Sequence, residues 1–119
     1  MTQVKQQKSF DDMLAQAVDY TIKYCLGEIN ANIISDYLQK RNLPLSEISN
    51  NPELFSEELR NILGFGGGQI LGAASVLEET ILEVLCRRLG TKHYFERPVN
   101  FPLELRKLKE EYNNGESWR

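Results

Sequence analysis

The amino-acid sequence predicts a single all-α domain, a compact bundle of about five helices. Three observations support this fold class. Apolar residues recur every three or four positions in several separate stretches, which is the spacing of an amphipathic helix. Most of these stretches are bounded by Ser, Asn, Pro or Gly at positions where helices begin and end. The length of 119 residues, with 41% hydrophobic and 26% charged residues, is that of one ordinary globular domain.

The first helix is expected from about Phe10 to Leu26. Ser9 offers an N-cap oxygen directly before it. Its inner stripe is expected to contain Leu14, Ala17, Val18, Thr21, Ile22 and Cys25. Tyr20 and Tyr24, one turn apart, are expected at the edge of the core, and a pair that stacks on a ligand is the alternative.

The second and third helices are expected at about Ile29–Arg41 and Pro52–Leu63, joined by a connector with a single turn at Ser46–Ser49. Asn51 is a favourable N-cap, and proline is common at the first position of a helix. The inner face of the second helix is expected to hold Ile29, Ile33, Ile34, Tyr37 and Leu38. The exposed face of the third is expected to hold Glu57, Glu58 and Arg60.

The most apolar stretch, Ile70–Leu89, predicts a largely buried helix at the centre of the bundle. Its inner face is expected to include Leu77 and Ile81. A narrower wet face is expected to hold Glu78, Glu79, Glu83, Arg87 and Arg88. The half from Ile70 to Leu77 carries no charge, so we expect it to be enclosed nearly all round.

Small residues in that uncharged half also predict self-association. They let a second backbone approach closely, and a two-fold pairing is the commonest way to cover an exposed apolar patch. We therefore expect a homodimer whose interface includes Gly72, Ala73 and Val76.

The glycine-rich segment Gly64–Gln69 lies directly before this helix. We expect a tight turn in which glycines allow close backbone approach. The alternative is an anion site on free backbone N–H groups, but the lysine of a phosphate-binding loop is missing. Thr91–Phe101 is expected to be extended, and Pro102 starts a last helix, about Pro102–Asn113. Both ends of the chain, residues 1–8 and 114–119, are expected to fray.

The sequence gives no support for an enzyme, a metal site or a cofactor. His93 is the only histidine and has no catalytic partner pattern. Cys25 and Cys86 belong to no metal-binding motif and are expected to be reduced, core-filling thiols in a cytoplasmic protein. Glu78, Glu79 and Glu83 resemble half of a di-metal helix, but its Glu-x-x-His motif is absent. No stretch is long and apolar enough to cross a membrane.

Charge is unevenly distributed although the net charge is only −3. Residues 46–83 carry seven acids and one base, whereas residues 84–119 carry eight bases and five acids. A small nucleic-acid-binding regulator is therefore the rival hypothesis, and it would use Arg87, Arg88, Lys92, Arg97, Arg106 and Lys107. The basic cluster Arg87, Arg88 and Lys92 is expected to serve the helix dipole and solubility, and a site for a phosphate or an acidic partner is the alternative. A helix-turn-helix is disfavoured, because the third helix exposes acids that would repel phosphates.

Four motifs resemble a known family. They are Leu38-x-x-Arg-Asn-Leu-Pro-Leu-Ser-Glu-Ile48, Asn51-Pro52-Glu53-x-Phe55, Leu59-x-x-Ile62-x-Gly64 and Leu77-Glu78-x-x-Ile81-x-x-x-Leu85. Together they resemble the small helical archaeal family described as the Nitrosopumilus output domain, over about Gly27–Gly90. Three consecutive glycines and an extension over residues 91–119 depart from that pattern.

The resemblance implies an all-α signalling-output or interaction module with no catalytic residues to carry over. The sequence thus predicts one domain over residues 1–119 that acts as a non-enzymatic, regulatory protein-interaction module. Its partners are expected to be a second copy or another protein rather than nucleic acid.

Overall fold

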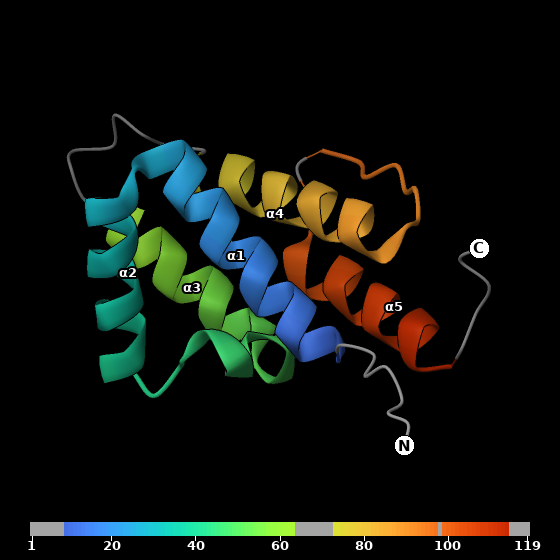
Figure 1. Cartoon of the computed structure of the whole chain (residues 1–119), viewed down its shortest axis with the longest axis horizontal. Coiled ribbons are helices and arrows are strands. Elements are labelled where there is room, and N and C mark those ends of the chain that lie inside the picture. Colours follow the sequence, from blue (N-terminus) through green and yellow to red (C-terminus); the bar gives the residue numbers. More distant parts are fainter. Residues whose placement is uncertain (1–8, 64–72, 98, 115–119) are drawn as a thin grey trace, which may run out of the picture.

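The structure is a computed structural model that describes residues 9–63, 73–97 and 99–114. In this part of the chain it contains five α-helices and one 3-10 helix, and no strand. The elements are α1 (Phe10–Leu26), α2 (Glu28–Lys40), η1 (Leu45–Asn50), α3 (Pro52–Leu63), α4 (Ala73–Leu89) and α5 (Phe101–Asn113) (Figure 1). The predicted all-α class is confirmed.

Local capping residues explain why the helices begin where they do. Ser9 Oγ accepts a hydrogen bond from the backbone N–H of Asp12 at 3.0 Å, and Asn100 Oδ1 accepts one from Leu103 at 3.2 Å. The bounds of α1 and α3 agree with those expected from the sequence, while α5 begins one residue earlier. Gly64–Gln69, residues 70–72 and both chain ends beyond residues 9–114 lie outside the described residues.

Helix α1 lies across the middle of the molecule, with α2 near one end and α5 near the other (Figure 1). It packs against α2, η1, α4 and α5, whereas α4 packs against α1, α3 and α5. The central place expected for the Ile70–Leu89 helix is therefore not confirmed. Nor is α4 enclosed all round, because Val76 is 61% exposed.

The core contains one side of each α-helix. Leu77 and Ile81 are buried at 4% and 0% exposure, so the predicted inner face of α4 is confirmed. At the other side of the core the Phe55 ring of α3 lies 5.5 Å from the Phe101 ring of α5, centroid to centroid. The most completely buried large side chains are Phe55, Phe101, Leu14, Leu38, Leu43, Ile48, Leu59, Ile81, Leu82, Leu85, Leu105 and Leu108.

Two predictions about the first helices are wrong. Ile29 and Ile33 are 77% and 57% exposed, because α2 buries a different face, Ala31, Ile34 and Leu38. Cys25 is exposed as well. Residues 23–25 are all exposed, so the buried stripe of α1 ends at Ile22.

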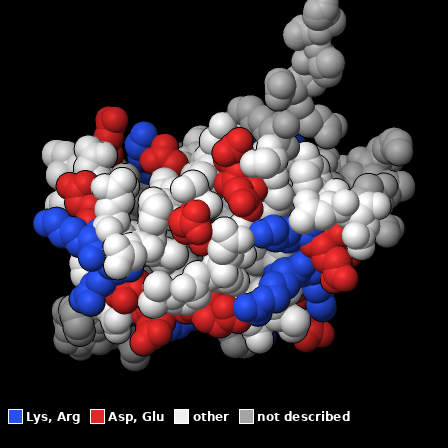
Figure 2. All heavy atoms as spheres, turned by 90° about the horizontal axis from the view of Figure 1, so that it is seen from below, with Lys and Arg blue, Asp and Glu red and all other residues white. Residues whose placement is uncertain are grey.

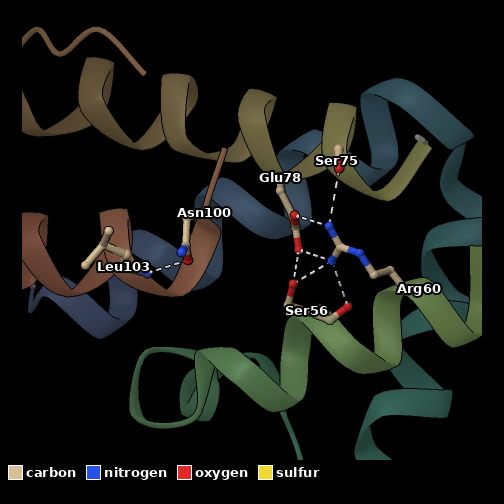
Figure 3. A network of polar contacts seen from close by, with 6 residues as sticks. All are labelled: Ser56, Arg60, Ser75, Glu78, Asn100 and Leu103. Carbon is tan, nitrogen blue, oxygen red and sulfur yellow. Dashed lines mark hydrogen bonds and ion pairs between the residues drawn. The ribbon is translucent and has the colours of Figure 1, made fainter. Parts of the chain in front are cut away.

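A polar cluster joins α3 to α4 and corrects a further prediction (Figure 3). Glu78, expected on the wet face, has 0% exposure. Arg60 of α3 neutralises it, with Nη1 donating to Oε2 at 2.8 Å and Nη2 donating to Oε1 at 3.1 Å. The Ser56 hydroxyl donates to the same carboxylate, and Ser75 accepts a hydrogen bond from Arg60 at 3.2 Å. The carboxylate also raises the pKa of Arg60 by hydrogen bonding to it.

We expect Arg60→Leu to destabilise the protein by about 3 kcal/mol, since it leaves a buried carboxylate without its cation. This is the lower end for breaking a buried pair, because the Arg60 side chain is 47% exposed and water reaches one side of it. The double variant Arg60→Leu with Glu78→Leu should recover most of the loss, because an apolar pair is often neutral there. Urea unfolding measures both. A loss below about 1 kcal/mol for Arg60→Leu, the level of an exposed pair, would contradict the interpretation.

Candidate functional site

The acidic residues of segment 46–83 are largely neutralised within the fold. Four of its seven carboxylates form ion pairs with arginines: Glu53 with Arg106, Glu58 with Arg41, Glu78 with Arg60 and Glu79 with Arg97. Three of these arginines come from outside the segment, which explains much of the uneven charge as internal complementarity. On the face shown in Figure 2, residues of the two signs are interspersed and neither forms a continuous area.

Glu58 is the second buried carboxylate that the sequence analysis placed on an exposed face. Its exposure is 7%, because Tyr37 of α2 covers it and donates a hydrogen bond to Oε1 at 2.8 Å. Asn61 donates to the same oxygen at 3.3 Å, and Arg41 lies 3.9 Å from it. The Tyr37 hydrogen bond, with smaller contributions from Asn61 and Arg41, holds the pKa of Glu58 below its ordinary value of 4.5.

The basic cluster at the end of α4 differs from this pattern. Arg87, Arg88 and Lys92 are all exposed, and none forms an ion pair with another described residue. In the rival nucleic-acid hypothesis, Arg97 and Arg106 were to extend this cluster, but they pair with glutamates. Arg87, Arg88 and Lys92 are thus unpaired cations that lie close together in the chain, and Lys107 on α5 is a further unpaired cation of the basic third.

Beside this cluster lies a surface that we call the tyrosine surface, lined by Gln16, Asp19, Tyr20, Lys23, Tyr24 and Arg88. It forms a shallow pocket of about 530 Å³ that is open to solvent. The rings of Tyr20 and Tyr24 stack 6.0 Å apart at 10°, and they are 47% and 77% exposed. The expected place of Tyr24 at the core edge is therefore wrong. Stacked at the surface, the two rings offer a partner apolar area that α1 leaves uncovered.

Arg88 is the contribution of α4 to the tyrosine surface. Its Nη1 donates a hydrogen bond to Gln16 Oε1 at 3.3 Å, and its guanidinium carbon lies 5.8 Å from the Tyr20 ring centroid. These contacts exist because α1 and α4 pack side by side in opposite directions (Figure 1). The sequence identified Arg88 as part of a basic cluster, but its pairing with Tyr20 spans too many residues to be visible as a motif.

The extended segment expected at Thr91–Phe101 carries a second pocket, about 620 Å³ in volume. It is lined by Glu79, Glu83, His93, Tyr94, Phe95, Glu96 and Arg97. Its one arginine already has a partner, because Arg97 donates to Glu79 at 2.7 Å, and His93 lies 3.5 Å from Glu111. No group of three metal-ligating side chains occurs among the described residues. This pocket is therefore a weaker candidate than the tyrosine surface.

The other sequence-predicted site residues lie apart from the tyrosine pocket. Ala73 is partly buried and Val76 exposed on α4, and Gly72 lies outside the described residues. Cys86 is buried, and burial raises the pKa of its thiol to about 11, which disfavours the reactive thiolate. None of the described helices has the length and apolar character needed to cross a membrane.

Comparison of the chain with family models, with curated proteins and with solved structures found no match.

The lowered pKa of Glu58 predicts a pH-dependent contribution to stability. A carboxylate whose pKa is lower in the folded state stabilises the fold above its unfolded value, and that stabilisation disappears as pH falls through the folded value. Tyr37→Phe should therefore reduce the free energy of unfolding most at about pH 7, and the difference from the unmodified protein should shrink below about pH 4.5. Urea unfolding across this range measures it. Tyr24→Phe is the matched control. If the loss of unfolding free energy in Tyr37→Phe were the same at every pH, Tyr37 would not be the cause of the lowered pKa of Glu58.

Proposed function

We propose that this chain is a non-enzymatic protein-interaction module with a regulatory, signalling-output role, and that the tyrosine surface is its docking site. The observation that carries the proposal is the exposed stack of Tyr20 and Tyr24 beside Arg88. Tyrosine and arginine are the residues most enriched among those that dominate protein–protein binding energy. The resemblance to an output-domain family points in the same direction.

Two further features support a non-catalytic, cytoplasmic protein. The buried carboxylates Glu58 and Glu78 are held by several hydrogen bonds within the fold, which favours structural roles for both. Cys25 and Cys86 are free thiols, and an exposed free thiol such as Cys25 suits a reducing compartment.

The tyrosine surface can be tested by affinity capture from native lysate followed by mass spectrometry. Tyr20→Ser combined with Tyr24→Ser should reduce captured partner by about tenfold or more, as expected when a binding hot spot is removed. Tyr94→Ser is the matched control, because Tyr94 is 89% exposed and lies outside this surface. Equal recovery with the double variant and the control would sink the proposal.

We also propose that two copies of the chain pair through the start of α4. Val76 is 61% exposed, and the partly exposed Ala73 lies one turn before it on the same side of the helix. A small residue at position 73 permits close approach of a second helix, and Gly72 belongs to the same proposed interface. This pairing leaves the tyrosine surface free for a different partner.

Ala73→Glu should convert a dimer to a monomer, because pairing would bury a charge without a partner. Sedimentation equilibrium at high micromolar concentration measures the change. Asn32→Glu, on the exposed face of α2, introduces the same charge elsewhere and should leave the dimer intact. If the unmodified protein sediments as a monomer under these conditions, the dimer proposal is wrong.

A nucleic-acid-binding regulator is the second candidate. It is favoured by one observation, the concentration of unpaired cations at Arg87, Arg88 and Lys92. It ranks lower because Arg97 and Arg106, which would extend the basic area, are paired with glutamates.

A further inference from the structure

We infer that the tyrosine surface binds an acidic segment of a partner protein, with a carboxylate on Arg88 and an apolar side chain against Tyr20 and Tyr24. This inference rests on the proposed function and specifies the chemistry of the partner. It follows from three features of the surface: its unbalanced charge, the fixed position of Arg88 and the shape of the pocket.

The tyrosine surface carries an arginine, Arg88, that pairs with no carboxylate of the described residues. Of the six arginines that the structure describes, four pair with glutamate, and the two that remain are the neighbours Arg87 and Arg88. The one carboxylate in the pocket, Asp19, is engaged by Lys23 at 3.0 Å. The pocket therefore keeps one uncompensated positive charge, and a partner carboxylate would supply the missing counter-charge.

Arg88 is already held in position for such a carboxylate. The hydrogen bond to Gln16 and the packing over Tyr20 restrict its side chain, so less conformational entropy is lost on binding. A guanidinium has five N–H donors in a planar fork, and the hydrogen bond to Gln16 leaves most of them for a bidentate carboxylate. Arg87 and Lys92 stand nearby in the chain, exposed and unpaired, and would attract further acids of the same segment.

The shape of the pocket indicates what accompanies the carboxylate. The pocket is shallow and open, and its volume of about 530 Å³ accommodates more than a single carboxyl group. The stacked rings of Tyr20 and Tyr24 form one wall, so the favoured occupant combines acidic with aromatic or aliphatic side chains. A nucleic-acid backbone fits less well, because a run of phosphates needs several cations in a row, whereas Arg97 and Arg106, which would extend the basic area, are paired with glutamates.

Fluorescence anisotropy with the full chain tests the inference. The probe is a fluorescein-labelled peptide of about four Glu-Phe-Gly repeats, and the matched probe replaces Glu with Gln. The acidic peptide should bind at least about tenfold more tightly than its Gln counterpart, and Arg88→Gln should remove that advantage. Arg88→Lys should restore only part of it, because lysine keeps the charge but lacks the fork. Lys107→Gln is the charge-matched control, because Lys107 is exposed and unpaired on α5.

Equal binding of the two peptides, or an unchanged affinity in Arg88→Gln, would overturn the inference. A labelled single-stranded DNA that binds more tightly than the acidic peptide, with affinity lost in Arg87→Gln with Arg88→Gln, would overturn it in favour of the nucleic-acid regulator. If the acidic peptide fails while Tyr20→Ser with Tyr24→Ser still abolishes partner capture, the proposed function stands and the acidic occupant is wrong. If the acidic peptide does not bind and the tyrosine double variant also leaves partner capture unchanged, both the inference and the proposed function are wrong. Melting curves of each variant confirm that the surface substitutions leave the fold intact.

Discussion

The contact between Glu78 and Arg60 sets the position of α4, on which much of the remaining structure depends. A carboxylate without solvent exposure is tolerated only when its hydrogen-bond acceptors are filled, and the arginine and Ser56 of α3 do this. Because a helix is rigid, fixing Glu78 against α3 also fixes the faces of all its neighbours. Leu77 and Ile81 then point to the core, while Arg88 comes to lie beside Gln16 of α1.

Internal charge pairing is the second organising feature of the fold. Arginines from the C-cap of α2, from α3, from α5 and from the segment before α5 each pair with a glutamate of segment 46–83, so that acids and bases distant in sequence are brought together. Most of these pairs are at least half exposed on the cationic side, and such pairs contribute little to stability individually. Their effect is on the charge of the surface. They neutralise four of the described arginines, so that the two unpaired ones, Arg87 and Arg88, lie at the end of α4.

The sequence was sufficient for features that depend on near neighbours in the chain. The first residues of α1 and α3 follow from Ser9, Asn51 and Pro52, whose effects extend over a single turn. The face of α2 was mistaken because Ile29 and Ile33 give the helix two possible apolar faces, and only packing chooses between them. Glu58 and Glu78 were mistaken because their partners Tyr37 and Arg60 are 21 and 18 residues away. The residues of the candidate site could be identified from the sequence, because Tyr20, Tyr24 and Arg88 were each noted there. That Arg88 lies beside Tyr20 could not be predicted.

The link between α1 and α2 has a consequence for how the chain tolerates changes in length. Gly27 is the one residue between the two helices, and its φ of 90° is a backbone conformation that other L-residues rarely adopt, although a Cβ there would meet no atom within 4 Å. One residue inserted at this corner would rotate every side chain of α2 by about 100° about its axis. Ala31, Ile34 and Leu38 would leave the core together, and the apolar side chains now in solvent would turn toward it. The number of residues up to this corner therefore determines which face of α2 is buried, so an insertion or deletion there is expected to be tolerated poorly.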